Sequence, residues 1–155
     1  MKNRGFTLIE LLMVIAVVAI VAALAVPMMR DLIENARLTT TSNSIVEAVA
    51  LARSEAVKRN QIVRVTPTDG ANWANGWSVI LADNSSVQQF DAVPFGLAVT
   101  ASEAIADIQF QANGTRVAGG NPLTLSVCTP KGKGRVVTLT ATGSTKIQAL
   151  DAGCV

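Results

Sequence analysis

Histidine is absent from the 155 residues of this chain, and cysteine occurs only twice. Without histidine, neither a Ser-His-Asp nor a Cys-His catalytic arrangement can be built. The chain also lacks a phosphate-binding Gly-x-x-x-x-Gly-Lys-Ser/Thr motif, and its cysteines are too far apart for a Cys-x-x-Cys metal site. The aspartates and glutamates show no paired spacing. We therefore expect a protein that is not an enzyme and that needs no cofactor or metal ion.

A long uncharged run near the N-terminus dominates the sequence. It covers residues 11–29 and follows the basic residues Lys2 and Arg4. As a helix it would be about 28 Å long, close to the ~30 Å hydrocarbon core of a bilayer. The basic flank predicts a cytoplasmic N-terminus. Glu10 stands at the edge of this span, where a carboxylate is costly unless it has a partner, so we interpret it as functional.

The segment from Gly5 to Glu10, Gly-Phe-Thr-Leu-Ile-Glu, resembles the type III signal of type IV pilins and type II secretion pseudopilins. The resemblance implies that prepilin peptidase cuts after Gly5 and that the new N-terminus, Phe6, is methylated. It also implies that Glu10 pairs with the N-terminal amine of a neighbouring subunit during filament assembly. An adjacent ammonium is the most favourable way to keep this carboxylate ionised in lipid.

Two other interpretations of the N-terminal segment are possible. Ala23-Leu24-Ala25 would suit the cleavage site of an ordinary secretory signal, but the uncharged run exceeds the usual apolar core of ~7–15 residues. A plain single-span anchor would leave Glu10 without a role.

The two cysteines are expected to form a disulfide. An N-in span places the rest of the chain in the bacterial periplasm, which is oxidising. A Cys128–Cys154 bond would tie the C-terminal end to an earlier strand and stabilise the fold by roughly 3 kcal/mol. Two free thiols are the alternative.

Charge argues against a surface that is basic throughout. Removing Lys2 and Arg4 from the 13 basic residues leaves eleven, which equals the number of acidic residues. Any contact with nucleic acid would therefore need a local patch.

Beyond the membrane span, residues 30–60 are predicted to continue the helix as an amphipathic half. Pro27 should kink the helix without ending it, Asn60 should end it, and Glu55 and Arg59 should form an exposed i,i+4 pair. One apolar stripe is expected at helical spacing: Leu38, Ile45, Val49, Ala52 and Ala56.

Residues 61–155 are predicted to form an antiparallel β-domain packed on the helix, an α+β arrangement typical of pilins. Asn113-Gly114 is a hairpin signal that joins residues 108–112 to 115–117. The expected strands are residues 61–66, 76–81, 87–90, 97–100, 105–112, 123–129, 135–141 and 146–150.

The stretch from Leu51 to Arg59, followed by Trp73 and Gly76-Trp77, is similar to the GspH/FimT/FimU subgroup of minor pilins and pseudopilins. Trp73 and Trp77 could form a recognition surface, but core positions are favoured in so small a β-domain. Arg53 and Glu55 could mark a subunit contact, or simply a solvated helix face.

The densest basic cluster is Lys131, Lys133 and Arg135, interleaved with glycines. Such a loop, together with Lys146, could contact DNA phosphates, but a hairpin turn with solvated lysines is favoured. DNA-binding members similar to FimT carry Gly-Arg-x-Arg near the C-terminus. Here the corresponding segment is Gly143-Ser144-Thr145-Lys146, which argues against DNA uptake.

The resemblance to the GspH/FimT/FimU subgroup implies a minor pilin that primes and joins a type IV pilus, near its tip, and supports twitching motility. The expected parts are a leader at residues 1–5, a transmembrane segment at 6–29, the amphipathic half at 30–60 and a periplasmic β-domain at 61–155. The resemblance implies other major and minor pilins, the inner-membrane assembly platform and prepilin peptidase as partners, and the apolar span implies inner-membrane lipid. A GspH-type secretion pseudopilin and a DNA receptor for natural transformation are the alternatives.

Overall fold

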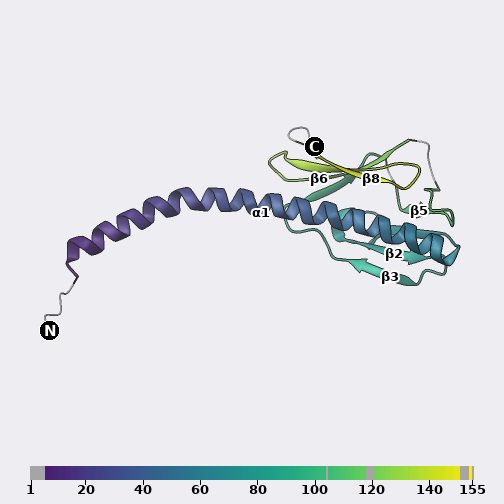
Figure 1. The fold of residues 1–155 in the computed structure, drawn as a ribbon, viewed down its shortest axis with the longest axis horizontal. Helices are drawn as coiled ribbons and strands as arrows, with labels where there is room; N and C mark the ends of the chain where they lie inside the picture. The colour runs from purple at the N-terminus through teal and green to yellow at the C-terminus, as the bar shows by residue number, and fades with distance from the viewer. Residues whose placement is uncertain (1–5, 104, 118–120, 151–153, 155) are drawn as a thin grey trace. The chain divides into compact units, whose positions relative to one another are not determined.

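The computed structural model describes residues 6–103, 105–117, 121–150 and 154, and it divides into two compact units. The first unit comprises Met1–Ala36 and the second Arg37–Val155. Helix α1, Leu8–Arg59, runs through the boundary between them (Figure 1). The predicted leader, residues 1–5, lies outside the described residues.

The first unit consists of the N-terminal part of α1, and its apolar side chains are exposed. Leu12, Ile15 and Leu24, for example, are all more than half exposed. In length and composition α1 could span a membrane. Pro27 lies inside the helix, which continues past it as predicted, because the loss of one hydrogen bond does not end a long helix.

In the second unit, the remainder of α1 packs against two four-stranded antiparallel sheets (Figure 1). The first sheet has the order β3-β2-β1-β5, and the second has the order β4-β6-β7-β8. The strands are β1 (Val63–Pro67), β2 (Trp77–Leu81), β3 (Ser86–Phe90), β4 (Ala98–Ala101), β5 (Ile108–Phe110), β6 (Leu123–Cys128), β7 (Gly134–Leu139) and β8 (Thr145–Leu150). A short 3-10 helix, η1 (Trp73–Asn75), precedes β2. The predicted α+β pilin architecture is thus confirmed. The division of the strands into two sheets was not predicted.

The apolar stripe predicted for α1 is confirmed, since all five of its members are buried. Three alanines four residues apart, Ala48, Ala52 and Ala56, are completely buried. Side chains this small let the strands approach the helix backbone closely. The buried Ser42 hydroxyl donates to the Leu38 carbonyl at 2.8 Å, which satisfies its polar group inside the core.

Asn60 ends the helix as predicted, in a left-handed conformation with φ of 52°. The Gln61 amide then donates to the Ala56 carbonyl at 3.2 Å, which satisfies one of the last free carbonyls of the helix.

The predicted exposure of Glu55 is wrong, because this side chain is buried, with only 7% of the residue exposed. Its carboxylate accepts a hydrogen bond from Arg59, as predicted, and a second one from Lys58 at 3.4 Å. The hydrogen bond from Arg59 holds the pKa of Glu55 below its usual value. A buried carboxylate needs such partners to remain charged.

Strand β5 is shorter than the predicted strand at residues 105–112. The N-terminal part of the predicted strand begins instead with a tight turn, in which the Ile105 amide donates to the Glu103 carbonyl. On the other side, the Gly114 amide donates to the Gln111 carbonyl at 2.8 Å and closes the predicted Asn113-Gly114 turn. The returning arm pairs with β5 through a single bridge, Phe110 to Arg116.

The predicted Cys128–Cys154 disulfide is confirmed, with the two Cα atoms 5.5 Å apart. It lies over Gly134, the first residue of β7. A Cβ atom at this position would be 2.1 Å from the Cys154 sulfur and 2.6 Å from the Val127 carbonyl oxygen. Only glycine therefore fits beneath the disulfide.

Removing the disulfide should destabilise the second unit. We expect Cys154→Ser to lower the free energy of unfolding by about 3 kcal/mol, because the unfolded chain regains the entropy that the cross-link removes. Urea titration of the full chain in detergent would measure this through Trp73 and Trp77 fluorescence. The Cys128→Ser/Cys154→Ser double variant should match the single variant, and unchanged unfolding midpoints would contradict the prediction.

Candidate assembly sites

The start of α1 is organised by a reciprocal pair, Thr7 and Glu10. The Thr7 amide and hydroxyl both donate to Glu10 Oε2 at 2.9 Å, and the Glu10 amide donates back to the Thr7 hydroxyl oxygen at 3.3 Å. The Leu11 amide donates to the Thr7 carbonyl as the first helical bond. This is a capping box, in which two otherwise unpaired backbone donors are satisfied.

The capping role of Thr7 was not predicted from the sequence, although its signal is there. Thr-x-x-Glu directly before an apolar run is the usual signature of such a helix start. Through this contact Thr7 holds the carboxylate at the N-terminal end of the helix, where a negative charge is favoured by the helix dipole.

Two residues were predicted to be processed. Gly5 lies outside the described residues, while Phe6 precedes the helix and is 81% exposed. Cleavage after Gly5 and methylation of Phe6 therefore remain predictions. The new amine would belong to the residue directly before Thr7.

The tryptophans lie in the core, as favoured above. Trp73 and Trp77 are buried, with ring centroids 6.5 Å apart, and Trp77 stacks on Phe90 at 5.9 Å. Trp77 and Phe90 therefore pack β2 against β3, and neither tryptophan presents a recognition surface.

The basic residues considered for DNA contact do not form one patch. Lys131 and Lys133 lie exposed in the turn between β6 and β7, and Arg135 faces Val127 across the ladder. Lys146 faces Thr138, three residues further along β7. Because side chains alternate between the two faces of a sheet, Lys146 and Arg135 lie on opposite faces.

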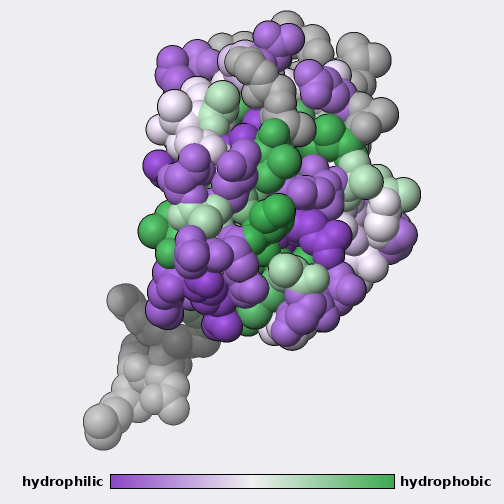
Figure 2. Space-filling view, turned by 90° about the vertical axis from the view of Figure 1, so that its right-hand side faces the viewer, coloured by the Kyte–Doolittle hydropathy of each residue, from purple (hydrophilic) through white to green (hydrophobic). Residues whose placement is uncertain are grey.

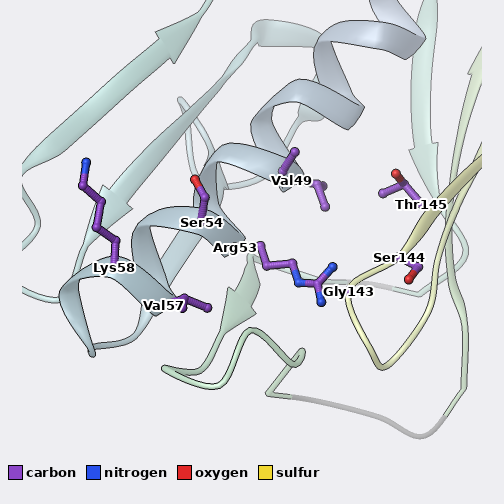
Figure 3. Close-up of a pocket in the computed structure, with 9 residues that line it drawn as sticks. Val49, Arg53, Ser54, Val57, Lys58, Gly143, Ser144 and Thr145 are labelled. Atoms are coloured by element: carbon purple, nitrogen blue, oxygen red, sulfur yellow. The ribbon is translucent and has the colours of Figure 1, made fainter.

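Arg53 packs beneath two turns that sequence analysis did not connect. Cβ atoms built on Gly114 and Gly143 would both lie 3.2 Å from Arg53 Nε, and both glycines have positive φ. The carbonyl oxygen of Gly114 would also be 2.9 Å from a Cβ at Gly143. The two turns therefore meet over the aliphatic part of this side chain, and its guanidinium points toward the turn that contains Gly143 and Ser144 (Figure 3).

A groove of about 690 Å³ lies between α1 and this turn. Figure 2 shows the face at the C-terminal end of α1, where apolar side chains gather between hydrophilic ones. The groove is lined by Val49, Ala50, Arg53, Ser54, Val57, Lys58, Gly143, Ser144 and Thr145.

Comparison with known protein families places two matches on the chain. The family described as "Type II transport protein GspH" matches residues 41–143. The prokaryotic N-terminal methylation motif matches residues 1–26, which includes the segment from Gly5 to Glu10.

Individual relatives agree with these matches. Pilin-like protein PilA1 of Thermus thermophilus is 30% identical over 92 residues, which cover 59% of this chain and 55% of that protein. A fimbrial protein of Pseudomonas aeruginosa is 34% identical over 68 residues, or 43% of this chain and 44% of its own length. The chain thus spans about half the length of the curated relatives that it matches.

Two solved structures share the fold. The type IV minor pilin FimU of Pseudomonas aeruginosa superimposes with a TM-score of 0.65 at 24% identity, over 77% of this chain and 96% of FimU. The minor pseudopilin EpsH of Vibrio cholerae gives a TM-score of 0.54 at 16% identity, over 73% of this chain and 97% of EpsH. With its methylation motif, its long helix and its GspH match over most of the globular unit, the chain belongs to the GspH family of type IV minor pilins and type II secretion pseudopilins.

Proposed function

We propose that this chain is a minor pilin that primes and joins a type IV pilus. The observation that carries the proposal is the first unit, a membrane-length helix with exposed apolar side chains and a capped Glu10 at its start. Such a helix needs lipid first and then other helices to cover it. The resemblance to FimU, which is 25% identical in a second crystal form with a TM-score of 0.62, supports the pilus over the secretion system.

In this proposal the chain is a structural protein of a filament and carries no catalytic site. It is inserted in the inner membrane with its N-terminus in the cytoplasm and its globular unit in the periplasm. Prepilin peptidase cuts after Gly5 and Phe6 becomes methylated. The assembly platform then moves the subunit into the pilus, where it lies near the tip among other major and minor pilins.

Glu10 sets the axial register in this proposal. Its carboxylate pairs with the Phe6 amine of a neighbouring subunit, and any shifted register leaves a charge unpaired in an apolar core. Thr7 keeps the carboxylate at the helix start before that partner arrives, since both of its donors hold the same oxygen.

A secretion pseudopilin is the second candidate. The family matched by residues 41–143 is described as a type II transport protein, and EpsH has the same fold. The same physics would then build a short periplasmic filament.

Locating the protein separates the two candidates. We expect mass spectrometry to find it in pili sheared from the cell surface, and we expect pili to become scarce in a deletion strain. Normal pili together with secreted enzymes retained in the periplasm would contradict the proposal and support the pseudopilin.

The charge on Glu10 can be tested apart from its capping role. We expect Glu10→Ala to leave membrane insertion intact and to lower incorporation into filaments about tenfold or more, because the neighbouring amine loses its partner. Glu10→Gln is the matched control, since an amide still accepts from Thr7 but carries no charge. It should fail as Glu10→Ala does, and normal incorporation of the glutamine variant would refute the role of the ion pair.

Processing can be tested at Gly5. A glutamate side chain at this position should block cleavage, so Gly5→Glu should give a slower-migrating band on an immunoblot of whole cells. Asn3→Glu adds the same charge within the leader and should still be cut. A Gly5→Glu band that co-migrates with the mature wild type would rule out the processing signal.

A further inference from the structure

The groove beside Arg53 has a chemical character that the proposed function does not explain. Its apolar walls come mainly from Val49, Ala50 and Val57, and Val57 is 53% exposed. Ser54 and Ser144 also line it, and the Ser54 hydroxyl donates to the Leu51 carbonyl at 2.9 Å. None of the nine lining residues is acidic, although two are basic.

Arg53 is the cation that this groove offers to a ligand. In the part of the chain that the structure describes, no hydrogen bond or ion pair engages its guanidinium. The acid two residues away, Glu55, is already occupied by Lys58 and Arg59. In Figure 3, Lys58 points away from Arg53, which alone extends toward the opposite turn.

Arg53 is exposed, but packing restricts the stem of its side chain. Its stem lies against Gly114 and Gly143, where Cβ atoms would come within 3.2 Å of Nε. A stem restricted in this way leaves the guanidinium less freedom to lose on binding, and its planar fork matches a carboxylate through two parallel hydrogen bonds.

We propose that this groove binds a segment of an adjacent, different pilin subunit in which an aspartate or glutamate lies next to an apolar side chain. The carboxylate pairs with Arg53, and the apolar side chain covers Val57 and Ala50. A nucleic acid fits less well, because one free cation between apolar walls cannot follow a chain of phosphates. The inference rests on the proposed assembly into a filament and names the chemistry of one contact within it.

Photo-crosslinking in assembling cells tests this contact. The full chain carries a benzophenone amino acid in place of Val57, and the adducts are mapped by peptide mass spectrometry. We expect an adduct with another pilin subunit, at residues next to an aspartate or glutamate. Arg53→Glu in the same chain should lower the adduct yield about tenfold or more, because an attractive pair becomes repulsive.

Three further variants make the result specific. Gln148→Glu, which adds a negative charge to an exposed position of β8, should leave the yield unchanged. Arg53→Lys should retain part of the yield, since it keeps the charge but not the fork. Replacing the mapped acid of the partner by arginine should restore the adduct of Arg53→Glu, a rescue that a folding defect could not give.

The same cells separate failure of this contact from failure of the proposed function. If the protein is present in sheared pili but gives no adduct, only the contact is overturned. An adduct with a second copy of this chain, or one that Arg53→Glu leaves unchanged, overturns it as well. If the protein is absent from pili, the proposed function fails, and the contact that rests on it fails too.

Discussion

The globular unit depends on the close approach of two sheets to one helix face. Ala48, Ala52 and Ala56 are completely buried and form one row along α1. Residues from both sheets belong to the same core as this row. A larger side chain in the row would push the strands outward, and cores this well packed accommodate extra volume poorly. The positions of the strands and turns therefore follow from the smallest side chains of the helix.

The first unit has the opposite requirement, although the same helix builds it. Its large apolar side chains are exposed, and the described structure offers nothing to bury them. Among the described residues at its start, Thr7 and Glu10 form a polar pair that satisfies its own hydrogen bonds. The second unit buries its own core, whereas the apolar helix of the first unit must be covered by lipid or by other subunits. Such a chain is suited to storage in a membrane followed by assembly.

Local patterns predicted much of this structure. Turn residues and β-branched runs predicted the helix end at Asn60, the eight strands to within a few residues and the hairpin at Asn113-Gly114. The oxidising compartment predicted the disulfide. The burial of Glu55 could not be predicted, because it depends on where the strands lie around the helix. For the same reason, the division into two sheets and the groove at Arg53 were not predicted, since both join segments far apart in the sequence. The capping box could have been predicted, because Thr-x-x-Glu before an apolar run is a local sequence pattern.

The packing of Arg53 has a consequence for how this family can vary. Gly114 and Gly143 lie against the same side chain, and a Cβ atom added to either glycine would come within 3.2 Å of it. A side chain at either turn would press on Arg53, and the residue that carries it would also have to adopt a left-handed backbone conformation. At Gly143 its Cβ atom would lie 2.9 Å from the carbonyl oxygen of Gly114 as well, so a shorter residue at position 53 would not make room for it. Relatives that keep these two turns in contact should therefore keep both glycines, whereas position 53 can change, and the residue found there would record whether a relative has kept the cation of the groove.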